Sequence, residues 1–231
     1  MRQNLRTIDY SNGYEDHAFE FLKARESSSI GAKIVDAWAR SLGSGAEIIE
    51  LGCGGGVPVT KTLFNAGLKI RAIDASPTLI REFRSRFPSI PAKCEPAQLS
   101  DYFGLDYDAA ISIGLLVLLD APSQLSMIPR VSAILKPGAR FLFTAPAEIG
   151  RWKDSITHRE SVSLGRALYA KTLRDSGFRV VGTYKDEGEN NYYEAEKLPK
   201  SPRSRVKIAH PLHEMRRPAG QRAFQTSGGI G

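Results

Sequence analysis

The 231-residue sequence has few cysteines and no long apolar segment. Only Cys53 and Cys94 are present, too few for a disulfide framework. The longest charge-free apolar run, residues 109–119, has 11 residues, whereas a membrane-spanning helix needs about 20. The opening segment MRQNLRT lacks the apolar stretch of a signal peptide. We therefore expect a cytoplasmic protein with no membrane span.

The excess of positive charge is confined to the end of the sequence. The chain has 32 Lys and Arg against 25 Asp and Glu, a net charge of +7. Residues 197–231 hold eight of these bases and one of the acids, so residues 1–196 hold 24 of each and are neutral. This last segment is proline-rich and lacks periodic apolar spacing, which predicts a disordered basic tail. Its single aromatic residue, Phe224, makes nucleic-acid binding beyond weak tail contacts unexpected.

The neutral part of the chain predicts one α/β domain at residues 29–196, preceded by an N-terminal segment, residues 1–28. Helical apolar spacing, proline starts and glycine stops indicate helices at 29–42, after 58, from 77, within 123–135 and at 164–175. Strands are expected at 46–51, 69–74, 92–95, 107–113, 139–145, 178–184 and 191–195, with an irregular stretch at 146–163. This alternation predicts a doubly wound, mostly parallel seven-stranded sheet. The last two strands are joined by KDEGEN, too short for a crossover, so the final strand is expected to be antiparallel.

A glycine-rich loop follows the first predicted strand. Gly52, Gly54 and Gly56 alternate with other residues just after the acid Glu50. A dinucleotide loop needs the spacing G-x-G-x-x-G, and no register of this loop provides it. The second strand ends in Asp74, 18 residues beyond Gly56, where a carboxylate can accept hydrogen bonds from both hydroxyls of a ribose. The sequence therefore predicts a ligand that contains a nucleoside, bound at a loop without the spacing of a dinucleotide-binding loop.

Four segments resemble the class I S-adenosylmethionine-dependent methyltransferases, in particular their small-molecule branch. They are IIELGCGGGVP, IRAIDAS, YDAAISIGLLVLL and LKPGARFLFTAP, and the likeness spans residues 14–196. The resemblance implies S-adenosylmethionine as cofactor, with Glu50 orienting its methionine part, Asp74 its ribose and Gln98 its adenine. The cofactor-binding residues expected in this way are Glu50, Gly52, Cys53, Gly54, Gly56, Asp74, Ala75, Gln98, Ser112 and Arg25. No metal site is expected.

Candidates for the substrate side come from both ends of the domain and from the irregular stretch. In the family that this sequence resembles, the N-terminal segment folds over the cofactor. Tyr14 and His17 are therefore candidates for contact with the reacting groups. Tyr192 and Tyr193 alternate on the last strand, so only one is expected to face the ligand. The irregular stretch adds Arg151, Trp152 and His158 as residues of a substrate lid. Cys94 is interpreted as a small core residue.

The expected activity is methyl transfer to a small-molecule acceptor, whose oxygen, nitrogen or carbon takes the methyl group. Methyl transfer depends mainly on alignment of nucleophile, methyl carbon and sulfur, so a general base is optional. Two alternatives stay open. One is an NAD(P)-dependent oxidoreductase on the same class of fold, and the other is a non-catalytic cofactor-binding or RNA-binding protein that uses the basic tail.

Overall fold

A computed structural model describes residues 8–199 of the chain. The predicted tail beyond Pro199 lies outside the described residues. The described helices are α1 (Ala18–Glu26), α2 (Ala32–Ser41), α3 (Val59–Asn65), α4 (Pro77–Arg86), α5 (Ala121–Ala133) and α6 (Arg166–Asp175), with short 3-10 turns η1 (Tyr102–Gly104) and η2 (Leu116–Leu118). The strands are β1 (Glu47–Leu51), β2 (Lys69–Asp74), β3 (Ala92–Cys94), β4 (Tyr107–Ser112), β5 (Leu135–Thr144), β6 (Ile149–Lys153), β7 (Glu160–Leu164), β8 (Phe178–Lys185) and β9 (Asn191–Lys197).

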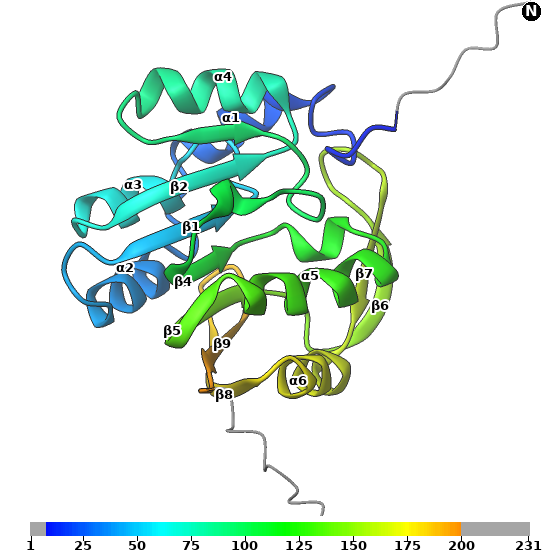
Figure 1. Ribbon diagram of the computed structural model, residues 1–231. Helices are drawn as coiled ribbons and strands as arrows, with labels where there is room; N and C mark the ends of the chain where they lie inside the picture. The colour runs from blue at the N-terminus through cyan, green and yellow to red at the C-terminus, as the bar shows by residue number, and fades with distance from the viewer. Residues whose placement is uncertain (1–7, 200–231) are drawn as a thin grey trace, which may run out of the picture. The chain divides into compact units, whose positions relative to one another are not determined.

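The main sheet has seven strands in the order β3-β2-β1-β4-β5-β9-β8 (Figure 1). Strands β1 to β5 are parallel, and β9 runs antiparallel between β5 and β8. The predicted doubly wound sheet with an antiparallel last strand is therefore confirmed. The strand order reverses between β1 and β4, and in open parallel sheets ligands bind at the carboxyl ends of the strands beside such a reversal.

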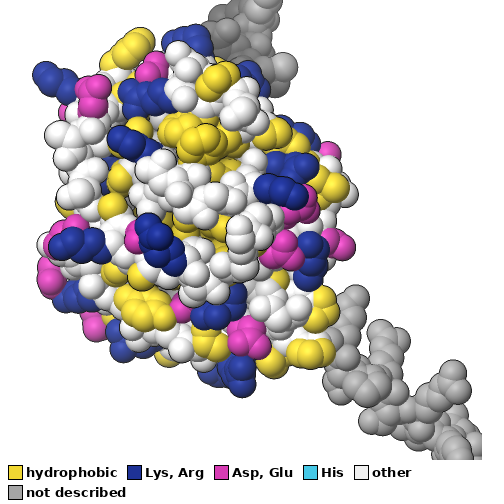
Figure 2. All heavy atoms as spheres, turned by 90° about the vertical axis from the view of Figure 1, so that its left-hand side faces the viewer, with side chains coloured by type: hydrophobic (Ala, Val, Ile, Leu, Met, Phe, Trp, Pro, Cys, Tyr) yellow, Lys and Arg dark blue, Asp and Glu magenta, His cyan; other side chains and the backbone are white. Residues whose placement is uncertain are grey.

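Two apolar layers hold the helices on opposite faces of the sheet. One face packs against α2, α3 and α4 through side chains such as Val35, Leu63 and Phe83. The other face packs against α5 and α6 through Ile128 and Leu173, among others. Because side chains alternate along a strand, neighbouring residues of β9 enter different layers. Outside these layers, basic and acidic side chains are interspersed on the face that Figure 2 shows, as expected for a neutral body.

Local sequence explains where the helices that border the site begin. Ser76 caps α4, since its Oγ accepts a hydrogen bond from the Leu79 N–H (3.2 Å), and Pro77 occupies the first helical position. Asp120 caps α5 in the same way through the Ser123 N–H (2.8 Å). The start of α4 at Pro77 agrees with the helix start expected from the sequence.

Three local expectations are corrected. The stretch 146–163 is not irregular, because β6 and β7 form a separate antiparallel hairpin there. Cys94 is exposed and not a core residue, since β3 is an edge strand of the sheet. Strand β9 continues through Lys197, and the Leu198 N–H donates to the Gly177 carbonyl (2.9 Å), so the ordered sheet extends past the predicted boundary at residue 196.

Candidate active site

A cavity of about 490 Å³ lies along the carboxyl ends of the strands. On the β2 and β3 side it is lined by Asp74, Ala75 and Gln98, and on the β9 side by Tyr192. The residues after β4 lie between these two sides because β4 is central in the sheet. The volume falls within the range of small-molecule sites, about 300–1,000 Å³. One continuous cavity therefore extends from the predicted nucleoside site, at the ends of β2 and β3, to β9.

The glycine loop and Asp74 form one hydrogen-bonded unit at the cavity wall. The Gly54 N–H donates to Asp74 Oδ2 (2.8 Å), and the Ser76 N–H donates to Asp74 Oδ1 (2.9 Å). Gly54 has φ +54°, and a Cβ built on it would lie 2.9 Å from the ring of Phe21. Burial raises the pKa of Asp74 above its ordinary value. The loop and the carboxylate are thus held ready for a ligand that donates hydrogen bonds.

Glu50 lies at the end of β1 and is completely enclosed. Its Oε2 accepts a hydrogen bond from the Thr60 hydroxyl (2.6 Å) in α3. Burial, together with the nearby charge of Asp74, raises the pKa of Glu50 to about 8. Glu50 does not itself line the cavity. A positive charge in the cavity would favour the ionised form of this carboxyl group.

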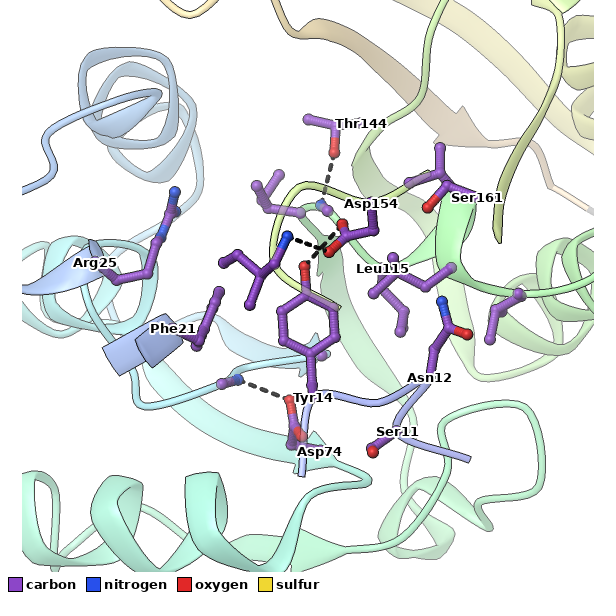
Figure 3. Close-up of a pocket in the computed structure, with 18 of the residues that line it drawn as sticks. Ser11, Asn12, Tyr14, Phe21, Arg25, Asp74, Leu115, Thr144, Asp154 and Ser161 are labelled. Atoms are coloured by element: carbon purple, nitrogen blue, oxygen red, sulfur yellow. Dashed lines mark hydrogen bonds between the residues drawn. The ribbon is translucent and has the colours of Figure 1, made fainter. Parts of the chain in front are cut away.

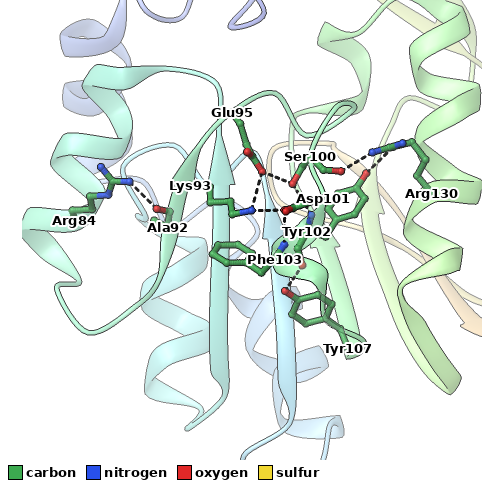
Figure 4. Close-up of polar contacts among 10 residues, drawn as sticks. All are labelled: Arg84, Ala92, Lys93, Glu95, Ser100, Asp101, Tyr102, Phe103, Tyr107 and Arg130. Atoms are coloured by element: carbon green, nitrogen blue, oxygen red, sulfur yellow. Dashed lines mark hydrogen bonds and ion pairs between the residues drawn. The ribbon is translucent and has the colours of Figure 1, made fainter.

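The segment after β3, which contains the cavity-lining Gln98, is fixed by a polar network. Figure 4 shows the residues of this network. The Ser100 hydroxyl donates to Glu95 Oε1 (2.5 Å), and the Arg130 guanidinium donates to the Ser100 carbonyl (2.6 Å). Lys93 pairs with Asp101 beside them. Gln98 is therefore presented by a loop that is tied both to β3 and to α5.

The N-terminal segment crosses the cavity and is tied down at both sides. On one side Glu15 accepts hydrogen bonds from the N–H and the hydroxyl of Thr78 at the start of α4 (3.0 and 2.8 Å). On the other side Arg159, from the β6–β7 turn, pairs with Asp9 (2.6 Å). We call residues 9–28 together with the β6–β7 hairpin the roof. Its two parts are far apart in sequence and are joined above the ends of the strands.

Two tyrosines that line the cavity are bound to carboxylates in the same manner. The Tyr14 hydroxyl donates to Asp154 Oδ2 (3.1 Å), as Figure 3 shows, and the Tyr192 hydroxyl donates to Asp186 Oδ2 (2.9 Å). Burial and the adjacent carboxylate raise the pKa of each phenol far above its ordinary value. Both phenols therefore keep their protons directed at carboxylates.

Among the described residues that line the cavity, Arg25 is the one cation. Its side chain extends toward the cavity from α1 (Figure 3), and within residues 8–199 it forms no ion pair. Burial lowers its pKa, while the neighbouring Tyr192, Tyr14 and Asp186 act in the opposite direction. A ligand carboxylate at this point would supply the missing counter-charge.

The residues predicted from the sequence fall into two groups. Those that line the cavity are Tyr14, Arg25, Gly52, Gly54, Asp74, Ala75, Gln98, Trp152 and Tyr192. Those that do not are His17, Glu50, Cys53, Gly56, Ser112, Arg151, His158 and Tyr193.

The residues outside the cavity have other surroundings. His17 Nδ1 lies 3.4 Å from Glu20 at the surface. Tyr193 stacks on Phe143 in the core, with ring centroids 5.1 Å apart. A Cβ at Gly56 would lie 2.4 Å from the ring of Phe87, so packing of α4 requires this glycine.

Several residues that line the cavity were not predicted from the sequence. They are Asn12, Asp154, Ser161 and Asp186, from the roof and from the β8–β9 connection. Asp154 accepts hydrogen bonds from the N–H groups of Ile156 and Thr157 (3.0 and 2.8 Å), which is the pattern of a turn-forming aspartate. Such a turn signal was present in the sequence, but it indicated a loop and carried no information about the cavity.

Among residues 8–199 no cluster of three or more His, Cys, Asp or Glu could hold a metal ion. No helix in that same range is long and apolar enough to cross a membrane.

Sequence comparison gives a family for the centre of the chain. Residues 48–138, which include the glycine loop, Asp74 and Gln98, match a family described as "Methyltransferase domain". Residues 48–138 carry a methyltransferase domain. The resemblance inferred from the four motifs is thereby confirmed, and with it the enzyme class, an S-adenosylmethionine-dependent methyltransferase. A comparison with curated protein sequences gives no match.

Solved structures agree with the methyltransferase fold. Magnesium protoporphyrin IX methyltransferase from Synechocystis, solved with S-adenosylmethionine bound, is 16% identical, with a TM-score of 0.67 over 84% of this chain and 100% of that chain. The 1,6-didemethyltoxoflavin-N1-methyltransferase of Burkholderia thailandensis is 16% identical, with a TM-score of 0.64 over 84% and 92% of the two chains. The CcbJ methyltransferase of Streptomyces caelestis is 11% identical, with a TM-score of 0.65 over 83% and 99%.

Proposed function

We propose that this methyltransferase domain transfers a methyl group from S-adenosylmethionine to a small-molecule acceptor in the same cavity. The observation that carries the proposal is the single cavity that joins Asp74 and Gln98 to Tyr14 and Tyr192. Cofactor and acceptor must be in direct contact for methyl transfer, and a shared cavity meets this requirement. The roof covers the cavity and limits the size of an acceptor.

The donor set of the cavity fits S-adenosylmethionine. Asp74 provides a half-buried carboxylate for the ribose hydroxyls, and the Gln98 amide can both donate to and accept from adenine. Arg25 would hold the methionine carboxylate. No Lys or Arg lies between Glu50 and Thr60, so the loop offers no basic side chain for a pyrophosphate. These features favour the sulfonium cofactor over NAD(P).

S-adenosylmethionine supplies the reaction with a methyl group bonded to a positively charged sulfur. The protein's contribution is orientation and the surrounding charge. Tyr14 and Tyr192 line the cavity together with the carboxylates that they bind, Asp154 and Asp186, and these acids favour a cationic centre in the cavity. Because their protons are directed at Asp154 and Asp186, these tyrosines serve as positioning groups, and neither is ionised at neutral pH.

Calorimetric titration tests the proposal. We expect the full chain to bind S-adenosylmethionine and S-adenosylhomocysteine and to show no heat of binding with NAD or NADP. Incubation with methyl-labelled cofactor and a panel of small hydroxyl, amine and carbonyl compounds should give labelled product. Binding of NAD with no binding of S-adenosylhomocysteine would instead favour the oxidoreductase alternative. The RNA-binding alternative rests on residues 197–231 and stays a prediction, tested by the salt dependence of RNA binding.

A further inference from the structure

Two polar atoms in the cavity wall have no hydrogen-bond partner. Asn12 Nδ2 and Ser161 Oγ are both inaccessible to water and lack a partner among the described residues. Both residues line the cavity, and Figure 3 shows them on the side of Tyr14 away from Phe21 and Arg25. A buried polar atom without a partner costs about 1–3 kcal/mol. Their position at a cavity suggests that a ligand, not the protein, satisfies them.

The hairpin geometry explains why Ser161 is turned toward the cavity. Trp152 and Ser161 are direct partners across the β6–β7 ladder, so their side chains share one face. Ser161 is 1% exposed, and both residues line the cavity. Ser163, two residues along the same face, does not line the cavity, and its hydroxyl donates to the Pro146 carbonyl (3.2 Å). Ser161 and Ser163 therefore lie on one face of β7, but among the described residues only the Ser163 hydroxyl has a hydrogen-bond partner.

Asn12 belongs to the same part of the roof. A Cβ added at the next residue, Gly13, would lie 2.7 Å from the Arg159 side chain, so this segment lies directly against the β6–β7 turn. Asn12 has φ +51°, a conformation that asparagine tolerates better than most residues. Its Nδ2 is a donor only, and it therefore requires an acceptor atom on the ligand.

The surroundings limit the chemistry of that ligand. Figure 3 shows Leu115 between Asn12 and Ser161, and Trp152 is the ladder partner of Ser161. Leu118 and Leu119 also line the cavity, and these apolar side chains suit a flat apolar body. Within the described range 8–199, the charged residues that line the cavity are three acids, Asp74, Asp154 and Asp186, and one base, Arg25. This excess of negative charge disfavours an anionic acceptor.

Resting on the function proposed above, we infer that Asn12 and Ser161 form the acceptor-specificity site, and that the acceptor is a flat, uncharged molecule with a carbonyl oxygen or ring nitrogen that accepts a hydrogen bond from Asn12 Nδ2. Ser161 Oγ pairs with a second polar atom of the same molecule. The methyl-accepting group is a separate hydroxyl or N–H of that molecule.

Binding to the full chain saturated with S-adenosylhomocysteine tests this inference. The probes are three bicyclic phenols of similar size: a hydroxyquinolone, which carries a carbonyl, naphthol, which lacks it, and hydroxynaphthoate, which is anionic. We expect the hydroxyquinolone to bind at least about fivefold more tightly than naphthol, and hydroxynaphthoate to bind most weakly. Equal binding of the first two, tightest binding of the anion, or no binding of the hydroxyquinolone would each overturn the inference.

Substitutions test whether Asn12 and Ser161 cause the preference for the hydroxyquinolone over naphthol. Ser161→Ala and Asn12→Gly should each reduce hydroxyquinolone affinity about five- to tenfold and leave naphthol affinity unchanged. Because Ser161 has no partner in the protein, Ser161→Ala should leave the melting temperature of the ligand-free chain within about 1 °C or raise it. Ser163→Ala is the matched control, since it should lower the melting temperature by about 2–4 °C and keep the probe preference.

S-adenosylhomocysteine binding separates this inference from the proposed function. If wild type binds no S-adenosylhomocysteine, the proposed function fails. If wild type binds S-adenosylhomocysteine and the variants keep the wild-type preference among the probes, only the assignment of Asn12 and Ser161 fails.

Discussion

The buried carboxyl group of Glu50 should make the free energy of unfolding depend on pH in a specific way. Its pKa is about 8 in the folded protein, against an ordinary value of 4.5. Between these values the folded chain binds a proton that the unfolded chain has released, so stability falls as pH rises. At about 1.4 kcal/mol per pH unit, the loss is about 3 kcal/mol at pH 7 and on the order of 5 kcal/mol above pH 8.

The substitution Glu50→Gln removes this titration and retains an oxygen that can accept the Thr60 hydrogen bond. We therefore expect the variant to be more stable than wild type in the ligand-free state. The difference should be near zero below pH 4.5 and should grow with pH. At pH 7 it corresponds to a rise in melting temperature of about 6–12 °C for a domain of this size.

Thermal and urea unfolding between pH 4.5 and 9, followed by circular dichroism, measure this difference. Glu26→Gln, at an exposed carboxylate, is the control and should show no such pH-dependent gain. A Glu50→Gln variant that is equally stable at every pH, or less stable at alkaline pH, would refute the reasoning. The same variant should bind S-adenosylmethionine more weakly than wild type above pH 8, because the positively charged cofactor favours an ionised carboxylate.

Four further outcomes are expected. Asp74→Ala should weaken S-adenosylhomocysteine binding at least 100-fold by calorimetry, since two hydrogen bonds to a charged acceptor contribute about 1.5–3 kcal/mol each; an unchanged dissociation constant would contradict the assigned role. Gly54→Val should abolish binding of the same ligand, because of its positive φ and the ring 2.9 Å from its Cβ; normal binding would reduce the loop to a simple turn. Tyr192→Phe should lower methyl transfer about tenfold, whereas Tyr193→Phe, in the core, should change the rate less than twofold; the reverse order would contradict the placement of β9. A chain that ends at Pro199 should keep its melting temperature within about 2 °C and lose affinity for heparin at low salt, whereas loss of cooperative unfolding would place the domain boundary later.

The predicted site residues that line the cavity are encoded by short-range patterns. The glycine loop and Asp74 lie at the ends of β1 and β2, and each pattern is complete within a few residues of the chain. The order of the elements was also predictable, because alternating helices and strands restrict the topology of the sheet. Gly56 was predicted to bind the cofactor, whereas in the structure it accommodates the ring of Phe87 and does not line the cavity.

The parts that could not be predicted depend on contacts between distant segments. The β6–β7 hairpin was missed because its inward positions carry Gly150, Trp152, Ser161 and Ser163. Small and polar residues there line or adjoin a cavity, so the usual alternation of apolar inward and polar outward positions is absent. The choice between the two tyrosines of β9 was equally inaccessible, because it depends on which helices cover each face of the sheet.

The way the roof is attached has a consequence for the rate of ligand exchange. Helix α1 buries only Ala18, and the rest of the N-terminal segment is held chiefly by polar contacts such as Tyr14–Asp154 and Asp9–Arg159. With so little apolar area removed from water, this segment can detach at a much lower free-energy cost than the sheet beneath it. Amide hydrogen exchange in residues 9–26 is therefore expected to be faster than in β1 and β4. Substrate entry and product release can then proceed through local opening while the sheet stays intact, which leaves turnover and global stability free to vary independently.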